Sequence, residues 1–282
     1  TLQCIGWQHA EPVLRSLAYA LLQHENENPA KADLAADRPG RRNAELARKI
    51  RKEWLDGKPS KDATTDLLSG LRTGSDEEVC DQVVKLLNNG VAAQSVWDAM
   101  LAGAGELVIR QPGIVALHAV TTTNALRYAY EATGNDETRR LLLLQNAAFL
   151  PLFRGALGSR GTAKEARIDQ LEATPVKESG PKAVAEILDD VSHDRMIAAR
   201  KTLAYLKEHT GAKQLIDAAR VLLFFKGDNA HDYKFSSAVL EDYYHASPAW
   251  RNQYLAASMF LLRGSGSPDN GLVQRTRAAL KA

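Results

Sequence analysis

The chain is poor in the features that define several common protein classes. Its two cysteines, Cys4 and Cys80, stand far apart, which excludes a disulfide framework and a cysteine-based zinc motif. No apolar stretch approaches the roughly 18 residues that a membrane span needs, so we expect a cytoplasmic protein that binds no membrane. Gly-x-Ser-x-Gly and phosphate-loop motifs are also missing, which argues against those two kinds of catalytic site.

No excess of one charge sign is present either. Lys and Arg total 36, against 34 Asp and Glu, for a net charge of +2. The densest basic cluster is interleaved with acidic residues, a pattern typical of a solvated helix face rather than a nucleic-acid-binding stripe. We therefore expect no nucleic-acid partner. Its basic members are Arg41, Arg42, Arg48, Lys49, Arg51 and Lys52, and its acidic ones Glu45, Glu53 and Asp56.

Apolar residues make up 45% of the chain and recur mostly at the spacing of amphipathic helices. Ser75 and Glu78 form a capping-box pattern before one of these segments. The sequence predicts one all-α domain over residues 1–282, with residues 155–181 as a possible irregular divider. The chain begins at Thr1, so we expect a fragment or processed form. The expected helices are 8–25, 43–55, 75–88, 95–107, 114–133, 136–153, 182–188, 195–209, 212–226, 230–245 and 250–262, with buried central segments at 114–130, 141–153 and 221–240.

The segment 227–234 is the strongest chemical signal. Gly227-Asp228-Asn229 ends an apolar run and starts a new helix. In that helix His231 and Lys234 lie three residues apart and share a face. We expect this face to point into an apolar interior, where a metal centre would explain both side chains.

Three further histidines, out of seven in the chain, are candidates for the same site. His118 lies in a helix with almost no charge and is expected to be buried. His9 and His193 each stand at a helix start. Taken singly, each has a plain alternative, since His118 could be a core residue with an ordinary hydrogen-bond partner and the other two could be surface residues.

Together, histidines on separate helices suit iron, copper, nickel or zinc. The inward Glu-x-x-His pairs of a ferritin-like di-iron site are missing, which favours a mononuclear, histidine-rich centre.

The His231–Lys234 segment, the His118 helix and the His9 helix together resemble the questin oxidase-like family. The resemblance implies an all-α fold and oxidative chemistry on aromatic polyketide-like small molecules with O2. It also implies one non-haem Fe(II) held by four histidines and a carboxylated lysine. In this sequence those positions are His9, His118, His193, His231 and Lys234, with Lys234 also a possible base in catalysis.

A lysine that stays uncharged beside a metal can react with carbon dioxide, and the resulting carbamate is an anionic oxygen ligand. The alternative for Lys234 is a surface lysine paired with Asp232 or Glu241. Asp232 and Asn124 are plausible residues to orient the histidine rings.

Two other functions stay open. A non-catalytic helical scaffold that binds a partner protein would need no such site. A haem-binding helical protein could use His118 or His9 as an axial ligand, without covalent attachment because no Cys-x-x-Cys-His motif is present. The sequence leaves the oligomeric state open.

Overall fold

The computed structural model describes residues 2, 6–23, 37–208 and 212–281. The chain divides into two units, Thr1–Arg38 and Pro39–Ala282.

The N-terminal unit contains a short 3₁₀ helix, η1 (Trp7–His9), followed by α2 (Ala10–Leu22). The sequence predicts this helix as a core-facing one, yet α2 buries none of its residues. Leu17, on its apolar stripe, is 55% exposed. Most of the stretch between the expected helices 8–25 and 43–55 lies outside the described residues, and α3 already begins at Arg38.

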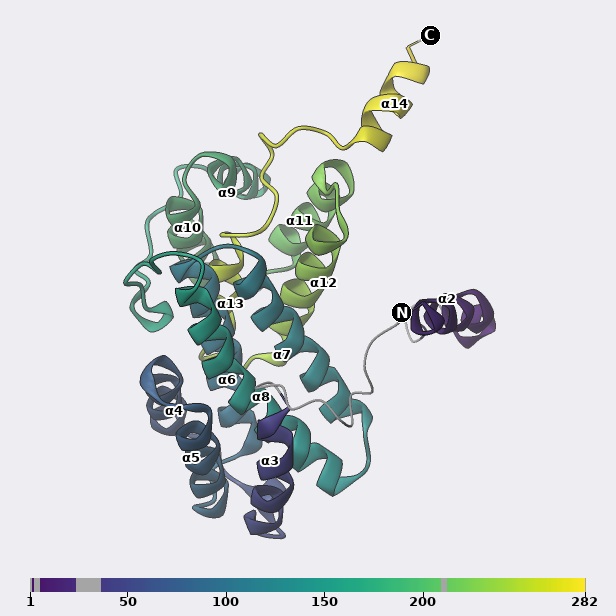
Figure 1. The fold of residues 1–282 in the computed structure, drawn as a ribbon. Helices are drawn as coiled ribbons and strands as arrows, with labels where there is room; N and C mark the ends of the chain where they lie inside the picture. Colours follow the sequence, from purple (N-terminus) through teal and green to yellow (C-terminus); the bar gives the residue numbers. More distant parts are fainter. Residues whose placement is uncertain (1, 3–5, 24–36, 209–211, 282) are drawn as a thin grey trace. The chain divides into compact units, whose positions relative to one another are not determined.

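Helix follows helix through the second unit (Figure 1). The described residues contain no β-strand, and one isolated parallel bridge joins Lys58 to Val91. The all-α prediction is confirmed. The helices of this part of the chain are α3 (Arg38–Lys49), η3 (Trp54–Asp56), α4 (Lys61–Thr73), α5 (Asp76–Asn88), α6 (Ala93–Arg110), α7 (Ile114–Ala132), α8 (Asp136–Gly158), η4 (Ile168–Gln170), α9 (Pro181–His193), α10 (Arg195–Glu208), α11 (Lys213–Lys226), α12 (Ala230–His245), α13 (Arg251–Ser258) and α14 (Gly271–Ala279).

The centre of the second unit is α6, which packs against α4, α7, α8 and α13. It is buried along almost its whole length, because small residues let its neighbours approach closely. A Cβ at Gly103 would lie 3.1 Å from Leu71 Cδ1, and one at Gly105 would lie 3.1 Å from Ile168 Cδ1. The prediction of a buried segment is confirmed for α8 and for the first half of α7, whereas Tyr128 of α7 is 46% exposed. The prediction for 221–240 is wrong at its start. Val221 and Phe224 of α11 are 52% and 69% exposed.

Local signals explain most helix starts. The Ser75–Glu78 capping box is present in full at α5. Ser60 caps α4 by accepting a hydrogen bond from Ala63 N. Helices α4 and α14 were not among the predicted helices, although the buried residues of α4, Ala63, Leu67 and Leu71, recur at helical spacing.

Helix α8 is long and apolar enough to cross a membrane by length and composition alone, with a mean hydropathy of 1.3 over its best window. It packs against α5 and α7, and Leu143, Leu144 and Ala147 are fully buried there.

The irregular segment 155–181 lies within the second unit and is fixed to it. Arg72 of α4 binds both Glu106 of α6, at 2.6 Å, and Asp169 of η4, at 2.6 Å. Glu106 also accepts a hydrogen bond from Ile168 N at 3.0 Å. This segment is therefore held against α4 and α6.

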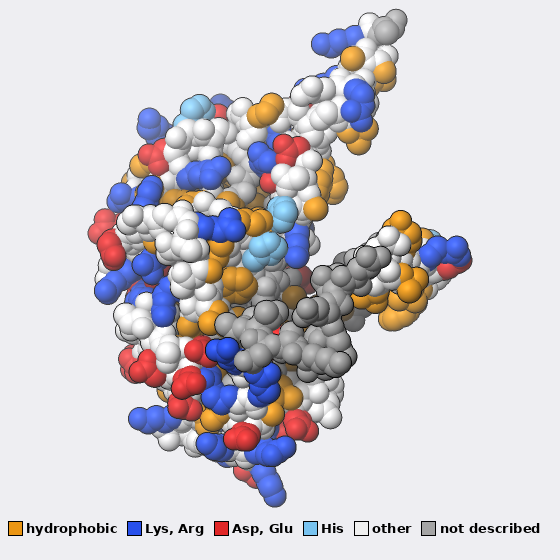
Figure 2. All heavy atoms as spheres, viewed as in Figure 1, with side chains coloured by type: hydrophobic (Ala, Val, Ile, Leu, Met, Phe, Trp, Pro, Cys, Tyr) orange, Lys and Arg blue, Asp and Glu red, His pale blue; other side chains and the backbone are white. Residues whose placement is uncertain are grey.

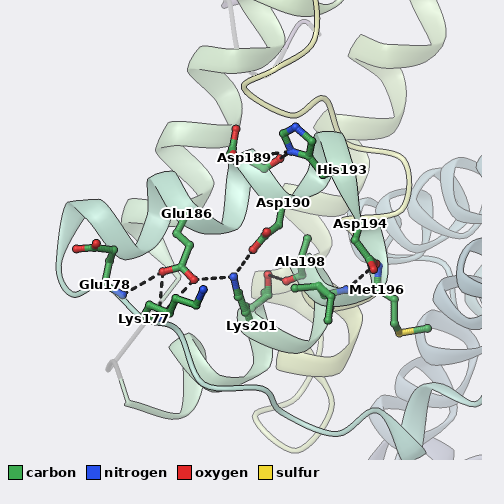
Figure 3. A network of polar contacts seen from close by, with 12 residues as sticks. Lys177, Glu178, Glu186, Asp189, Asp190, His193, Asp194, Met196, Ala198 and Lys201 are labelled. Atoms are coloured by element: carbon green, nitrogen blue, oxygen red, sulfur yellow. Dashed lines mark hydrogen bonds and ion pairs between the residues drawn. The ribbon is translucent and has the colours of Figure 1, made fainter.

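A second ion cluster joins α9 to α10 (Figure 3). Lys201 Nζ lies 2.6 Å from a Glu186 oxygen and 2.5 Å from an Asp190 oxygen. Burial lowers the pKa of Lys201, but hydrogen bonds to the two carboxylates outweigh it and leave the pKa raised.

We expect Lys201→Met to reduce the free energy of unfolding by about 1–2 kcal/mol, because two partly buried carboxylates lose their cation. Chemical denaturation followed by circular dichroism measures this effect. The matched control is Lys207→Met, which removes an exposed lysine with no ion pair in the described part of the chain. Equal stabilities of the two variants would contradict a stabilising role for the cluster.

Candidate metal centre

His118 and His231 come together in the structure although they are far apart in the chain. Helices α7 and α12, which carry them, pack against each other. The two imidazole rings meet edge to face, with centroids 5.6 Å apart and an interplanar angle of 86°. Two of the histidines that were predicted to converge, His118 and His231, thus lie next to each other.

The position of His231 is fixed by the turn that precedes it. Helix α11 ends at Lys226, and Asn229 caps α12 by accepting hydrogen bonds from His231 N at 2.9 Å and Asp232 N at 3.2 Å. Tyr233 Oη donates to Gly227 O at 3.1 Å and ties the new helix back to the turn. His231 therefore sits in the first turn of α12, as the Gly-Asp-Asn sequence predicts.

Lys234 belongs to the same cluster. Burial lowers the pKa of His118, and the nearby positive charges of Lys234 and His231 lower it further. Among the described residues no carboxylate lies within ion-pairing distance of Lys234, so neither Asp232 nor Glu241 pairs with it. The alternative of a surface ion pair for this lysine is therefore not seen.

The cluster faces solvent rather than the interior. His118 is half-buried, and His231 and Lys234 are exposed. Figure 2 shows histidine side chains gathered at the surface of the second unit. The expectation of a buried centre is wrong because the first turn of α12 follows an exposed stretch of α11 and lies at the edge of the core.

His193 does not join this pair. It ends α9, with Nδ1 3.0 Å from the Asp189 carbonyl oxygen and 3.7 Å from an Asp189 carboxylate oxygen (Figure 3). Its side chain is 69% exposed. Within the described residues, no group of three or more His, Cys, Asp or Glu is placed to hold a metal ion.

His9 lies in the N-terminal unit, where it ends η1 and serves as the N-cap residue of α2. Its side chain is exposed. Its role as a metal ligand stays a prediction.

The two residues expected to orient the histidine rings have other partners. Asp232 accepts a hydrogen bond from Arg263 Nη2 at 2.6 Å. Asn124 Nδ2 donates to Asp242 Oδ1 at 2.9 Å and to Glu241 Oε2 at 3.2 Å. Neither side chain is recorded bonding to His118 or His231, so the expectation is not supported.

A buried polar cluster around Asp242 of α12 was not predicted from the sequence. Tyr254 Oη of α13 donates to Asp242 Oδ2 at 3.0 Å, opposite the Asn124 bond. Burial raises the pKa of Asp242 to about 7, although the two hydrogen bonds act in the opposite direction. A sequence signal did exist, since Asp242 follows Phe235, Ala238 and Val239 on the buried side of α12.

A cleft of about 740 Å³ lies within the second unit near the start of α7 and of α12. Its lining includes Pro112, two residues before α7, and Asp232, next to His231. The cleft and the His118–His231 pair are thus at the same end of the α7–α12 helix pair. His193 lines this cleft rather than the histidine pair.

Comparison of the chain with protein-family models, curated proteins and solved structures finds no match in any of the three.

Proposed function

We propose that this protein is a metal-dependent oxidoreductase in which His118, His231 and Lys234 bind a non-haem iron ion that activates O2 toward an aromatic substrate. The single observation that carries the proposal is the approach of His118 and His231. Imidazole is a common ligand of transition metals, including iron.

The geometry of the pair fits a shared ion. Imidazole nitrogens bind a transition metal at ~2.0–2.1 Å, so two rings on one ion have centroids about 4.5–5.5 Å apart. The observed 5.6 Å lies just above that range. The lowered pKa of His118 favours its neutral form, which is the form that binds metal.

Lys234 supplies a third donor if its amine is carboxylated. It has no competing carboxylate partner in the described part of the chain, and it is close enough for its charge to act on His118. A carbamate there would replace a repulsive positive charge with a negative one. Iron would supply the O2 chemistry, while the three side chains hold the ion and the half-buried His118 ring limits water on its side.

The decisive experiment is metal binding by variants of the full chain. We expect His118→Ala and His231→Ala each to weaken Fe(II) or Co(II) binding at least tenfold, since a two-histidine core loses half its imidazole ligands. Lys234→Met should weaken metal binding less than either histidine variant. Removing bicarbonate should weaken metal binding to a similar extent in the wild-type chain and should have no effect on the Lys234→Met variant. Calorimetry under anaerobic conditions gives the affinities, and the visible spectrum of bound Co(II) reports the ligands.

Two other histidine variants serve as matched controls. His193→Ala removes the ring beside Asp189, and His245→Ala removes one that lies 3.4 Å from a Glu131 oxygen. Neither ring contacts the His118–His231 pair, so both variants should bind metal normally. If the pair variants bind as tightly as these controls, the proposed centre is wrong. Haem absorption in the purified protein would instead favour the haem-binding alternative.

A second candidate function is partner binding, favoured by the exposed apolar face of α11. Val221, Phe224 and Phe225 are 52%, 69% and 39% exposed, and such clustered apolar side chains often mark interaction surfaces. A protein that binds no added metal and shows no haem absorption would favour this helical scaffold.

A further inference from the structure

The 740 Å³ cleft combines an apolar floor with polar walls. Ile109, Phe260 and Leu262 line it and are themselves 0–5% exposed, so they form the packed floor. Ligand sites commonly have this build, in which apolar surface binds the body of a molecule and a few polar groups orient it.

One wall of the cleft is held rigidly. The loop after α13 crosses the end of α9, where Ser265 N donates to Leu188 O at 2.9 Å and Gly266 N donates to Ser192 Oγ at 2.9 Å. The two backbones are so close that a Cβ at Gly264 would lie 2.7 Å from Ser192 N. This wall is therefore formed before any ligand arrives, which reduces the entropy lost on binding.

The cations of the cleft have unused hydrogen-bonding capacity. Lys164 and Arg195 both line it, and neither forms an ion pair with a carboxylate among the described residues. Arg195 Nη1 donates to Phe260 O at 2.5 Å, which fixes the guanidinium and leaves its other N–H groups available. Arg263 Nε is buried and has no hydrogen-bond partner among the residues that the structure describes.

Most of the acidic side chains in the cleft are already engaged. Asp232 accepts from Arg263 Nη2 at 2.6 Å. Asp194 caps α10 by accepting from Met196 N at 2.9 Å and Ile197 N at 3.0 Å. Glu165 is the one cleft carboxylate with no hydrogen bond or ion pair recorded in the described structure. The donors of Lys164, Arg195 and Arg263 therefore exceed the acceptors left to meet them.

From this imbalance we propose that the cleft binds a small organic anion, with its carboxylate between Lys164 and Arg195 and its apolar body on the floor near Phe260. Arginine matches the planar geometry of a carboxylate through paired N–H donors. Lysine adds a mobile positive charge. This binding needs no metal, so its test is separate from that of the proposed iron centre.

The test uses two fluorescent probes that share one apolar body, naphthalene-2-carboxylate and the uncharged naphthalene-2-methanol. Equilibrium dialysis against the full chain gives both dissociation constants. We expect one saturable site that binds the carboxylate at least tenfold more tightly than the alcohol. Raising the salt concentration should weaken binding of the carboxylate probe and leave binding of the alcohol unchanged.

Variants assign the preference to the cleft. Lys164→Met and Arg195→Gln should each weaken carboxylate binding several-fold to tenfold and leave the alcohol unchanged. Lys164 is exposed and its ammonium makes no recorded contact, so its removal leaves the fold intact even if Arg195→Gln disturbs the bond to Phe260 O. The matched control is Lys85→Met. Lys85 is an exposed lysine of α5 that forms no ion pair within the described parts of the chain and does not line the cleft.

Three results would overturn the proposal. One is the absence of saturable carboxylate binding, and another is equal affinity for the two probes. The third is an equal preference for the carboxylate over the alcohol in the Lys164→Met variant and in the Lys85→Met control.

Discussion

Glu106→Ala should reduce the free energy of unfolding by about 3–5 kcal/mol, the typical cost of removing one partner of a buried ion pair. Glu106 is only 3% exposed and serves two partners at once. Its carboxylate receives two hydrogen bonds from Arg72, at 2.8 and 2.6 Å, and one from Ile168 N at 3.0 Å. Truncation leaves an almost buried guanidinium and a buried N–H group without that acceptor. Urea denaturation followed by circular dichroism measures the loss.

Two further variants of the same ion cluster serve as controls, one at a more exposed carboxylate and one that removes both buried charges. Asp169→Asn removes the more exposed carboxylate from Arg72 and should cost less than about 1 kcal/mol. The double variant Arg72→Met/Glu106→Leu removes both buried charges, and it should recover much of the loss because apolar replacements of buried pairs are often neutral. If Glu106→Ala costs no more than Asp169→Asn, the segment around η4 is not held by this pair.

Asp242 should make the protein less stable as the pH rises from about 4 to about 7. Burial raises the pKa of Asp242 to about 7 in the folded state, whereas an unfolded aspartate titrates at about 3.9. Between these values the folded chain keeps the proton and the unfolded chain has lost it, so unfolding becomes more favourable as the pH rises. The charge of Glu241 adds to this shift, and that of Arg127 opposes it.

Asp242→Asn removes the titration while keeping an amide oxygen that can accept from Tyr254. Relative to the unmodified protein, this variant should gain roughly 2–4 kcal/mol of stability between about pH 4 and pH 8, since each pKa unit is equivalent to about 1.4 kcal/mol. Denaturation curves at several pH values give the difference directly. The control Asp66→Asn, on the exposed side of α4, should leave the pH dependence unchanged. Parallel stability–pH curves for Asp242→Asn and the unmodified chain would show that Asp242 does not titrate in this range.

The helical character of the chain could be predicted because its causes are local. The capping box at Ser75 and Glu78, the Asn229 turn and the 3.6-residue apolar rhythm act within a few residues of each other. The same rhythm marks α4, whose omission was a failure to apply the rule rather than a limit of it.

Burial was predicted less well because an amphipathic pattern does not show which other helix, if any, packs against its apolar face. The apolar run of α11 suggested a core helix, yet Phe224 is 69% exposed. Helix α6 became the centre because its Ala and Gly residues permit close packing on all sides, a property that apolar periodicity does not reveal.

For the candidate site, too, local sequence patterns predicted some features and helix packing decided the others. The spacing of His231 and Lys234 placed them on one helical face, and the low charge of the α7 helix singled out His118. That His118 meets His231, that His193 instead lines the cleft, and that Asp232 binds Arg263 are all consequences of how α7, α9 and α12 pack.

The sequence by itself determined the helical character of the chain and where most helices begin, since caps and short-range spacing act through neighbouring residues. Only the tertiary structure decided which side chains meet, which carboxylates are buried beside Arg72 or Tyr254, and which cations in the cleft are left without a carboxylate. The physical reason is that burial and charge pairing depend on contacts between residues tens to hundreds of positions apart, and no local pattern encodes those distances.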